Sequence, residues 1–416
     1  MSRRARTLLT TAALLLLLVV PVCGEPGASG SAYVQCVLPN SAVVCWAGPG
    51  AEELELQVAH PAATVARQLS APERAEFRVD GLTPGGHSTW ELRGPDGGPT
   101  RANGVIRTPP LDDRAEFRFA LVGDSGGQPW WSSLRRAPVF HALARNGWLS
   151  PKGEVARIGA AMAAADPVFW LHAGDVIYPD PLNGSWDAGF FLPFAALGRT
   201  SPCFVALGNH DLMGDDGATV LGHFVLPGHE RPDGERMYSF GWGPLRVCVL
   251  DTNGAFGPEH PSLSWLRAEL AAATEPWLVV MGHHPVTSAS RQGDRKDLVE
   301  HLAPELARAG VDLYFAGHDH TYQRMRLEGG VRQVVSGGGG KSLYDLRDRP
   351  GMEAMSSTFH WCKVDVKGAS LTLTAIGLDG ATLDTFVLDH SVDAGRLERI
   401  RAFQPGRAQR IDALLR

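Results

Sequence analysis

Short apolar stretches that end in small polar clusters dominate the pattern of the chain after residue 110. Five of them are rich in valine, phenylalanine and leucine, and they cover 117–122, 168–172, 203–207, 277–281 and 311–315. Their length and composition predict buried strands. Each is followed closely by a cluster that opens with glycine and carries an acid, an amide or histidines. Because ligands gather beyond the carboxyl ends of strands in an open α/β sheet, we expect these clusters to lie together.

Helical spacing fills the intervals between these strands. Apolar residues recur three and four positions apart in 151–165, 262–273 and 295–309, and strands that alternate with amphipathic helices predict a layered α/β domain. The later segments 361–366, 370–374 and 385–388 alternate and turn at glycine or aspartate, which predicts antiparallel strands that complete a sheet. The tail from 391 to 416 has helical spacing and many arginines, and it is interpreted as a solvated terminal helix.

A different pattern covers residues 31–110. Short alternating strands such as 53–58 and 75–79 are separated by proline, glycine and aspartate turns, which is typical of a small β-sandwich. The segment 79–110 resembles the second half of a fibronectin type III domain, although His87 and Ser88 stand before Trp90 where such domains usually place an aromatic residue.

The N-terminal 30 residues have the outline of a secretory signal. Arginines precede an apolar stretch from Leu8 to Val22, which is about 15 residues long and shorter than the about 20 that a membrane span needs. Cleavage is therefore favoured over a permanent anchor, and lipid attachment at Cys23 is the alternative. The protein is expected to be secreted or held in the cell envelope.

Export would also affect the oxidation state of the cysteines. Cys36 and Cys45 flank a turn between two predicted strands, so a disulfide across this hairpin fits an oxidising compartment. Cys203, Cys248 and Cys362 lie inside apolar strand patterns and are expected to be buried thiols.

Composition narrows the range of functions. The chain has 416 residues, of which 44% are hydrophobic and 20% charged, and its formal charge is −6. These values are typical of a globular protein with one large core and a smaller extra domain. Removing residues 1–23, which carry three arginines and no acid, makes the charge more negative, so specific nucleic-acid binding is not expected.

The polar clusters carry the side chains of a metal site. Seven of them are candidate ligands: Asp124, Asp175, Tyr178, Asn209, His283, His318 and His320. Oxygen ligands and imidazoles together suit iron, zinc or manganese, and a carboxylate can bridge two such ions. Two ions about 3.5–4 Å apart grip a phosphoryl group and supply hydroxide for in-line attack.

In these motifs the chain resembles the purple acid phosphatases of the calcineurin-like metallophosphoesterase superfamily, over residues 115–390. The resemblance implies a four-layer αββα fold, in which two packed mixed sheets are flanked by helices. It also implies that Asp124, Tyr178 and His320 hold Fe(III) and that Asp175 bridges. The second ion, Fe(II), zinc or manganese, is then held by Asn209, His283 and His318. A tyrosine phenolate favours Fe(III), whereas an ordinary packed tyrosine is the alternative for Tyr178.

The resemblance is weaker on the substrate side. It implies that His210 contacts the phosphate and protonates the leaving oxygen, and Asp211 is expected to orient the imidazole. His284 is assigned either to substrate contact or to a position outside the ligands, beside the site or merely exposed. Relatives carry a further histidine about nine residues beyond the position of His283, but none is found here, and Arg291 is interpreted either as its cationic replacement or as a surface residue. The glycines at 337–340 are interpreted as a flexible turn.

The leading hypothesis is therefore an exported binuclear-metal phosphatase that acts on phosphate monoesters. Phosphodiester or nucleotide hydrolysis at the same site is the nearest alternative. A non-catalytic cell-envelope binding protein is the alternative from another class, and competent side chains at all seven ligand positions argue against it.

Overall fold

The structure, a computed structural model, describes residues 30–71, 74–126, 153–182, 186–229, 235–392 and 394–416. The expected leader, with the lipid attachment at Cys23, lies outside the described residues and stays a prediction. Among the described residues, no helix is both long enough and apolar enough to cross a membrane.

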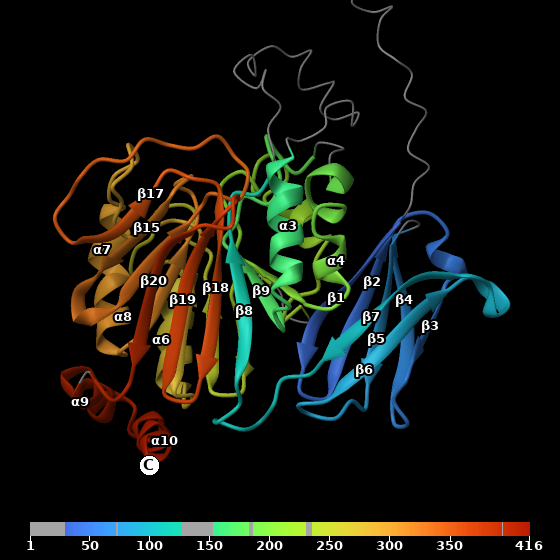
Figure 1. The fold of residues 1–416 in the computed structure, drawn as a ribbon, viewed down its shortest axis with the longest axis horizontal. Coiled ribbons are helices and arrows are strands. Elements are labelled where there is room, and N and C mark those ends of the chain that lie inside the picture. Colours follow the sequence, from blue (N-terminus) through green and yellow to red (C-terminus); the bar gives the residue numbers. More distant parts are fainter. Residues whose placement is uncertain (1–29, 72–73, 127–152, 183–185, 230–234, 393) are drawn as a thin grey trace, which may run out of the picture.

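The N-terminal region is all β, as the alternating pattern predicts, and is drawn in blue and cyan in Figure 1. Its four-stranded sheet runs in the order β1, β2, β5, β4, with bounds Ser31–Leu38, Ser41–Ala47, Arg74–Asp80 and Thr64–Ala71. Its three-stranded sheet runs β3, β6, β7, with bounds Glu55–Val58, His87–Arg93 and Thr100–Arg107. All pairings in both sheets are antiparallel.

Two mixed sheets form the centre of the rest of the chain. The six-stranded sheet runs β10, β9, β8, β18, β19, β20, with bounds Cys203–Val205, Phe169–His172, Phe117–Val122, His360–Lys367, Ser370–Gly377 and Thr382–Asp389. The seven-stranded sheet runs β11, β12, β13, β14, β16, β15, β17. Their bounds are Tyr238–Trp242, Leu245–Val249, Trp277–Met281, Leu313–Ala316, Arg332–Ser336, Tyr322–Arg326 and Met352–Ser356. The strands β8, β9 and β10 are mutually parallel, as are β12, β13 and β14.

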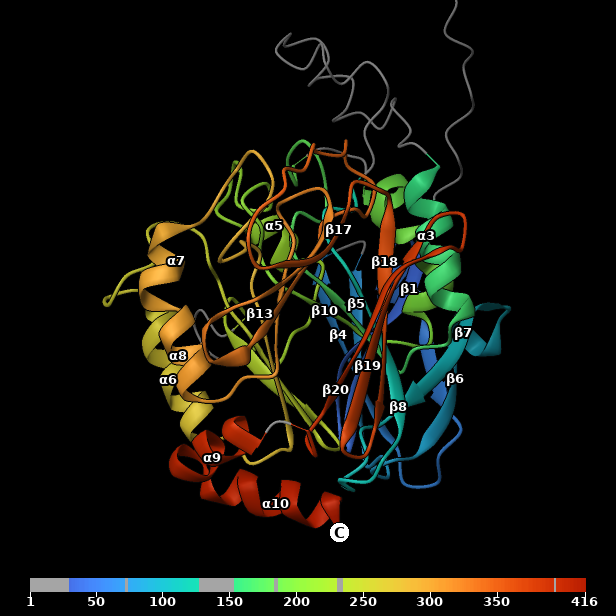
Figure 2. The same ribbon diagram turned by 60° about the vertical axis from the view of Figure 1, so that its left-hand side comes forward.

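The period-two alternation of the strands explains why two layers of core form. In β13, Val279 faces the other sheet and joins its apolar core, whereas Leu278 and Val280 face the covering helices. Because both faces are buried, β13 has a continuous apolar run in place of polar alternation. Between the sheets, the rings of Phe119 and Phe169 stack with centroids 4.9 Å apart. The four-layer αββα arrangement expected from the sequence is confirmed (Figures 1 and 2).

The helices flank the sheets, and the three segments predicted to be helical are helical with two differences in their bounds, whereas the short helices α4 and α5 were not predicted. The bounds are Glu154–Ala164 for α3, Ala195–Gly198 for α4, Ala218–Leu221 for α5, Pro261–Ala272 for α6, Lys296–His301 for α7 and Ala303–Arg308 for α8. The single helix predicted at 295–309 is split at Leu302, because Pro304 lacks the N–H that an uninterrupted helix would use. The helix predicted from residue 151 begins at Glu154 in the described chain.

The C-terminal tail forms two helices, α9 at Ala394–Phe403 and α10 at Pro405–Leu415. Its interpretation as a solvated segment is wrong, because Arg407 is fully buried. The Arg407 guanidinium donates to Asp312 at 2.7 Å and to the carbonyl groups of Pro276 and Ala309. These partners lie just before β13 and β14, so the tail covers the amino-terminal edge of the seven-stranded sheet.

The disulfide expected across the first hairpin is absent from the structure. Cys45 lies opposite Tyr33, and Cys36 lies at an irregularity after Gln35, so the two cysteines are not cross-strand neighbours and are not joined. Burial raises the pKa of the Cys45 thiol to about 12, which keeps it protonated. Cys203, Cys248 and Cys362 are buried thiols, as expected.

Candidate metal centre

The carboxyl ends of strands from both sheets meet at one edge, and the predicted ligands follow them. Asp124 comes after β8, Asp175 after β9 and Asn209 after β10, whereas His283 and His318 follow β13 and β14. A glycine precedes each cluster because the loops approach too closely for a side chain. A Cβ at Gly317 would lie 2.5 Å from Asp124 Oδ2, and one at Gly174 would lie 2.6 Å from His283 Nδ1.

Backbone strain accompanies this convergence. Asp124, Asp175 and His318 have φ values of 55°, 55° and 67°, in the left-handed region that residues other than glycine rarely adopt. Each such conformation costs of order 1–3 kcal/mol and persists only where the surrounding structure fixes it. These three residues are three of the seven predicted ligands, so part of the backbone strain in the described chain lies at this site.

The first group of ligand atoms surrounds the phenol of Tyr178. Its Oη lies 2.9 Å from Asp124 Oδ1, 2.8 Å from Asp175 Oδ2 and 3.3 Å from His320 Nε2. The distance from His320 Nε2 to Asp124 Oδ1 is 3.4 Å. Ligands bound to one ion at about 2.0–2.2 Å lie roughly 3 Å apart, so this spacing fits a single ion.

The second group contains two imidazoles and an amide. Asn209 Oδ1 lies 2.9 Å from His318 Nδ1 and 3.2 Å from His283 Nε2, and the two nitrogens are 3.3 Å apart. His283 Nε2 is also 3.5 Å from Asp175 Oδ1. Asp175 therefore presents one oxygen to each group, which is the geometry expected of a bridging carboxylate.

Hydrogen bonds outside the groups fix two of the imidazoles for ligation. His283 Nδ1 lies 2.7 Å from the carbonyl oxygen of Ala173, and His320 Nδ1 lies 2.7 Å from that of Ser342. A carbonyl only accepts, so each Nδ1 carries a proton and Nε2 is the nitrogen that faces the site. A metal ion would bind each ring at Nε2, after the loss of any proton on that atom.

The charges in the site favour a cation. Asp124 and Asp175 are almost completely buried. Burial would lower the pKa of His283, but the Asp175 carboxylate outweighs it and raises the pKa to about 10. The same imidazole outweighs the burial of Asp175 and holds the pKa of that carboxyl well below its usual range. Burial and the Asp124 and Asp175 carboxylates raise the pKa of Tyr178. A proton on His283 thus supplies the positive charge that metal ions would supply.

His210 and Asp211 differ in their contacts from the expectation. His210 Nδ1 donates to the carbonyl of Pro179 at 2.7 Å, and its ring lies 4.6 Å from that of Tyr178. The imidazole is thus oriented by Pro179 and not by Asp211. The Asp211 carboxylate accepts the backbone N–H groups of Gly208, Asp175 and Val176 at 2.8–2.9 Å. Asp211 joins the second and third clusters, so its predicted role in orienting His210 is wrong.

His284 lies beside the second group and is buried. Its Nδ1 is 3.1 Å from Thr252 Oγ1, and its ring centroid is 4.6 Å from that of His318. Ligand atoms of His283, His284 and His318 all lie within 4.8 Å of one another. Burial, followed by the charges of His283 and His318, lowers the pKa of His284, which keeps it neutral. A merely exposed position for His284 is therefore ruled out.

Arg291 is connected to the first group through an aromatic ring that the sequence did not indicate. The Arg291 guanidinium lies 4.6 Å from the centroid of Tyr344, and that ring stacks on His320 at 4.2 Å and 30°. The segment is fixed by bonds from Ser288 to Asp319 and by a β-bridge between Ser290 and Leu346. Arg291 is exposed, as the surface alternative expects, and its guanidinium also lies over the Tyr344 ring.

The glycines at 337–340 are not a flexible turn. Gly339 donates its N–H to the carbonyl of Gly123 at 3.0 Å, and a Cβ at Gly340 would lie 2.5 Å from the carbonyl oxygen of Ser125. All four glycines are buried. They bring Lys341 into the site. In the sequence, the only sign of this residue is its position directly after the glycine run.

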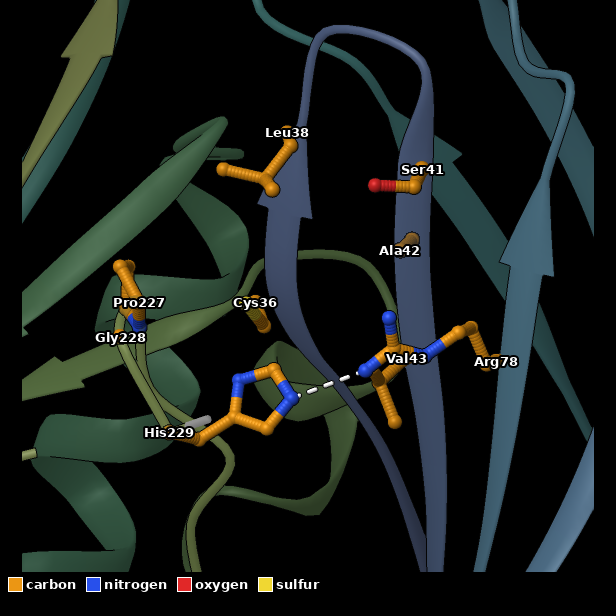
Figure 3. Close-up of a pocket in the computed structure, with 9 residues that line it drawn as sticks. All are labelled: Cys36, Leu38, Ser41, Ala42, Val43, Arg78, Pro227, Gly228 and His229. Carbon is orange, nitrogen blue, oxygen red and sulfur yellow. Dashed lines mark hydrogen bonds between the residues drawn. The ribbon is translucent and has the colours of Figure 1, made fainter. Parts of the chain in front are cut away.

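A separate cavity of about 290 Å³ lies between the N-terminal four-stranded sheet and the loop at 227–229 (Figure 3). Its walls include Leu38, Val43 and Pro227, and Arg78 bonds to His229 across it at 2.9 Å. None of the seven predicted ligands lines it, so it is distinct from the metal centre.

Comparison with known proteins agrees with this geometry. The pattern of the calcineurin-like phosphoesterase family matches residues 117–322. The chain is 31% identical to tartrate-resistant acid phosphatase type 5 of Homo sapiens, over 67% of this chain and 93% of that protein. It is 28% identical to purple acid phosphatase 7 of Arabidopsis thaliana, over 45% of this chain and 64% of that protein.

Solved structures share the fold. Purple acid phosphatase PPD1 from yellow lupin (Lupinus luteus) seeds superposes with a TM-score of 0.68 at 18% identity, over 86% of this chain and 74% of that one. PhoD superposes with a TM-score of 0.62 at 12% identity, over 86% of this chain and 90% of that one.

Proposed function

The chain belongs to the calcineurin-like phosphoesterases and, within them, to the purple acid phosphatase type, and from this premise we propose that it is an exported phosphatase that hydrolyses phosphate monoesters at two metal ions. One observation carries the proposal. Two sets of ligand atoms, each with the spacing of a single coordination sphere, share the carboxylate of Asp175.

The donor chemistry supports an assignment of ions. Asp124, Tyr178 and His320 would hold Fe(III), because a phenolate and carboxylates suit a hard trivalent ion, and Asn209, His283 and His318 would hold Fe(II), zinc or manganese. When bound, the two ions polarise the phosphoryl group and supply the hydroxide that attacks it.

The protein's own residues would bind and orient the substrate around these ions. His210 is held by Pro179 through Nδ1, so Nε2 on the opposite side of the ring is left for the substrate. A proton on that atom would stabilise the phosphate or pass to the leaving oxygen. His284 supplies a neutral imidazole beside His318, and Arg291 supplies a fixed cation on Tyr344.

The test compares turnover of an aryl phosphate with that of a bis-aryl phosphate, with metal content measured on the same sample. We expect monoester hydrolysis to dominate and Asn209→Ala to abolish it with loss of the second ion. A fully metallated protein without monoesterase activity would refute the proposal.

Phosphodiester or nucleotide hydrolysis is the second candidate. The observation that favours it is the Arg291–Tyr344 pair, which occupies the region where relatives carry a histidine and offers a ring and a cation to a second substituent on the phosphate. A bis-aryl phosphate turned over faster than the monoester would support this reading. A non-catalytic binding role is disfavoured because all seven predicted ligands converge.

The proposed export rests on the sequence of residues 1–30. Cell fractionation, followed by mass spectrometry of the mature N-terminus, tests it. A cleaved N-terminus beyond residue 20 supports secretion, and a lipid on Cys23 supports attachment to a membrane. An intact Met1 in the cytoplasmic fraction would contradict both.

A further inference from the structure

A buried lysine lies against the aromatic face of one predicted ligand. Lys341 is only 4% exposed, and its Nζ is 3.8 Å from the centroid of the Tyr178 ring. The electron-rich face of an aromatic ring attracts a cation at this distance. Burial of an ammonium group is otherwise costly, so this contact is part of what makes the position of Lys341 tolerable.

The backbone fixes Lys341 relative to the metal centre. Its N–H donates to the carbonyl of Asp124 at 3.1 Å, and the preceding Gly340 has a φ of 154°, a value that side chains other than glycine rarely permit. A Cβ at Gly340 would also lie 2.5 Å from the Ser125 carbonyl oxygen. Lys341 thus lies on the loop after β16, which is bonded to the loop that carries Asp124, and neither loop can shift without breaking these contacts.

The strength of the contact depends on the state of Tyr178. As a phenol, the Tyr178 hydroxyl donates to Asp124 and Asp175. As a metal-bound phenolate, the ring carries more negative charge, so its attraction for the ammonium group increases. A cation at 3.8 Å in a site shielded from water interacts more strongly than one at the surface.

We propose that Lys341 is a positioning residue that holds the Tyr178 ring and stabilises its phenolate form. The inference rests on the proposed function, since it takes Tyr178 to be a ligand. When the phenolate is stabilised, its charge-transfer band lies at shorter wavelength, and the phenolate donates less electron density to the metal. An iron ion held by this phenolate is therefore easier to reduce than it would be without the lysine.

The experiment measures the absorption of Tyr178 itself. It is obtained as the difference between the absorption spectra of metal-loaded wild-type protein and metal-loaded Tyr178→Phe protein. The difference is read in the visible range for iron and in the ultraviolet range for a colourless ion. We expect Lys341→Met, measured against its own Tyr178→Phe partner, to shift the band to longer wavelength. Lys341→Gln should shift it in the same direction, and Lys341→Arg should keep the wild-type position.

The matched control is Lys296→Met, which removes an exposed lysine from α7 and should leave the band unmoved. An unshifted band in both Lys341→Met and Lys341→Gln, at unchanged metal content, would overturn the inference while the proposed function stands. No difference between wild type and Tyr178→Phe would show instead that Tyr178 is not a ligand, and the inference would fall with that assignment.

Discussion

Tyr178 donates its phenol proton to Asp175 at 2.8 Å, and the other oxygen of that carboxylate accepts the backbone N–H of His210, also at 2.8 Å. Asp175 therefore connects a ligand of the first group to the loop that carries the expected substrate contact. Replacing the phenol proton by a metal ion leaves this arrangement in place, because the carboxylate keeps its bond to His210.

Substitution of Tyr178 by phenylalanine should remove any visible colour and retain most of the bound metal. Asp124, Asp175 and His320 remain to hold the ion, whereas the phenolate that gives the absorption is lost. The visible spectrum and the metal content of one sample provide the measurement. Tyr344→Phe is the control, since this ring stacks on His320 without joining the ligand group, and its colour should persist. A colourless wild-type protein that contains only zinc or manganese would contradict the iron assignment.

Asp211 is expected to contribute to stability and metal affinity because it joins two loops of the site. Asp211→Asn replaces an oxygen that accepts backbone N–H groups of Gly208 and Asp175 by an amide that donates. Unsatisfied buried donors cost about 1–3 kcal/mol, and loss of such an outer contact typically lowers metal affinity or activity about 10–100-fold.

Thermal unfolding and titration with the metal check the result for Asp211→Asn. If Asp211 instead oriented His210, the substitution would change the pH profile of activity and leave stability and metal affinity as they are. The structure predicts the opposite pattern, because Pro179 and not Asp211 bonds the imidazole.

The strands and the convergence of their clusters could be predicted because the signals are local. An apolar run such as 277–281 predicts a buried strand, and the polar cluster after each such run predicts that the clusters lie together. Asp211 could not be assigned in this way. Its position next to His210 in the sequence suggested a contact, but at this turn the two side chains point to different partners.

Contacts across distant segments account for the other differences. Lys341 and Tyr344 lie beside the ligands because loops after β16 fold back over β8, which no local pattern shows. Arg407 has the charge of a solvated helix residue, and only its partner Asp312, 95 positions earlier, explains its burial. The disulfide was expected from proximity in sequence, whereas the strand register places Cys45 opposite Tyr33.

Arg407 should be a major determinant of stability. Arg407→Met leaves Arg396 as the arginine paired with Asp312 and removes the bonds to Pro276 and Ala309, in a site where Arg407 is fully buried. Breaking a buried ion pair from one side typically costs about 3–5 kcal/mol. Denaturant unfolding measures the loss. Arg401→Met is the control, because its pair with Asp412 is exposed and should contribute less than about 1 kcal/mol. Equal stability of the two variants would contradict the anchoring role.

Acid should destabilise the fold through histidines that are buried outside the metal centre. Burial lowers the pKa of both His360 and His390 to about 4, whereas an unfolded histidine titrates near about 6.5. Between these pH values the unfolded chain binds a proton that the folded chain does not. The free energy of unfolding therefore falls as the pH drops from about 6.5 to about 4, and each histidine contributes up to about 3 kcal/mol of that loss.

The variant His390→Gln isolates the contribution of His390 to the pH dependence of the unfolding free energy. It removes the titrating group that stacks on Trp277 at 3.9 Å, so its unfolding free energy should fall less steeply between about pH 6.5 and pH 4 than that of the wild type. Denaturant unfolding at a series of pH values, with chelator present to separate the metal contribution, provides the comparison. His87→Gln replaces an exposed histidine and should keep the wild-type slope. Parallel curves for wild type and His390→Gln would show that His390 is protonated to the same extent in the folded and unfolded states, contrary to its burial.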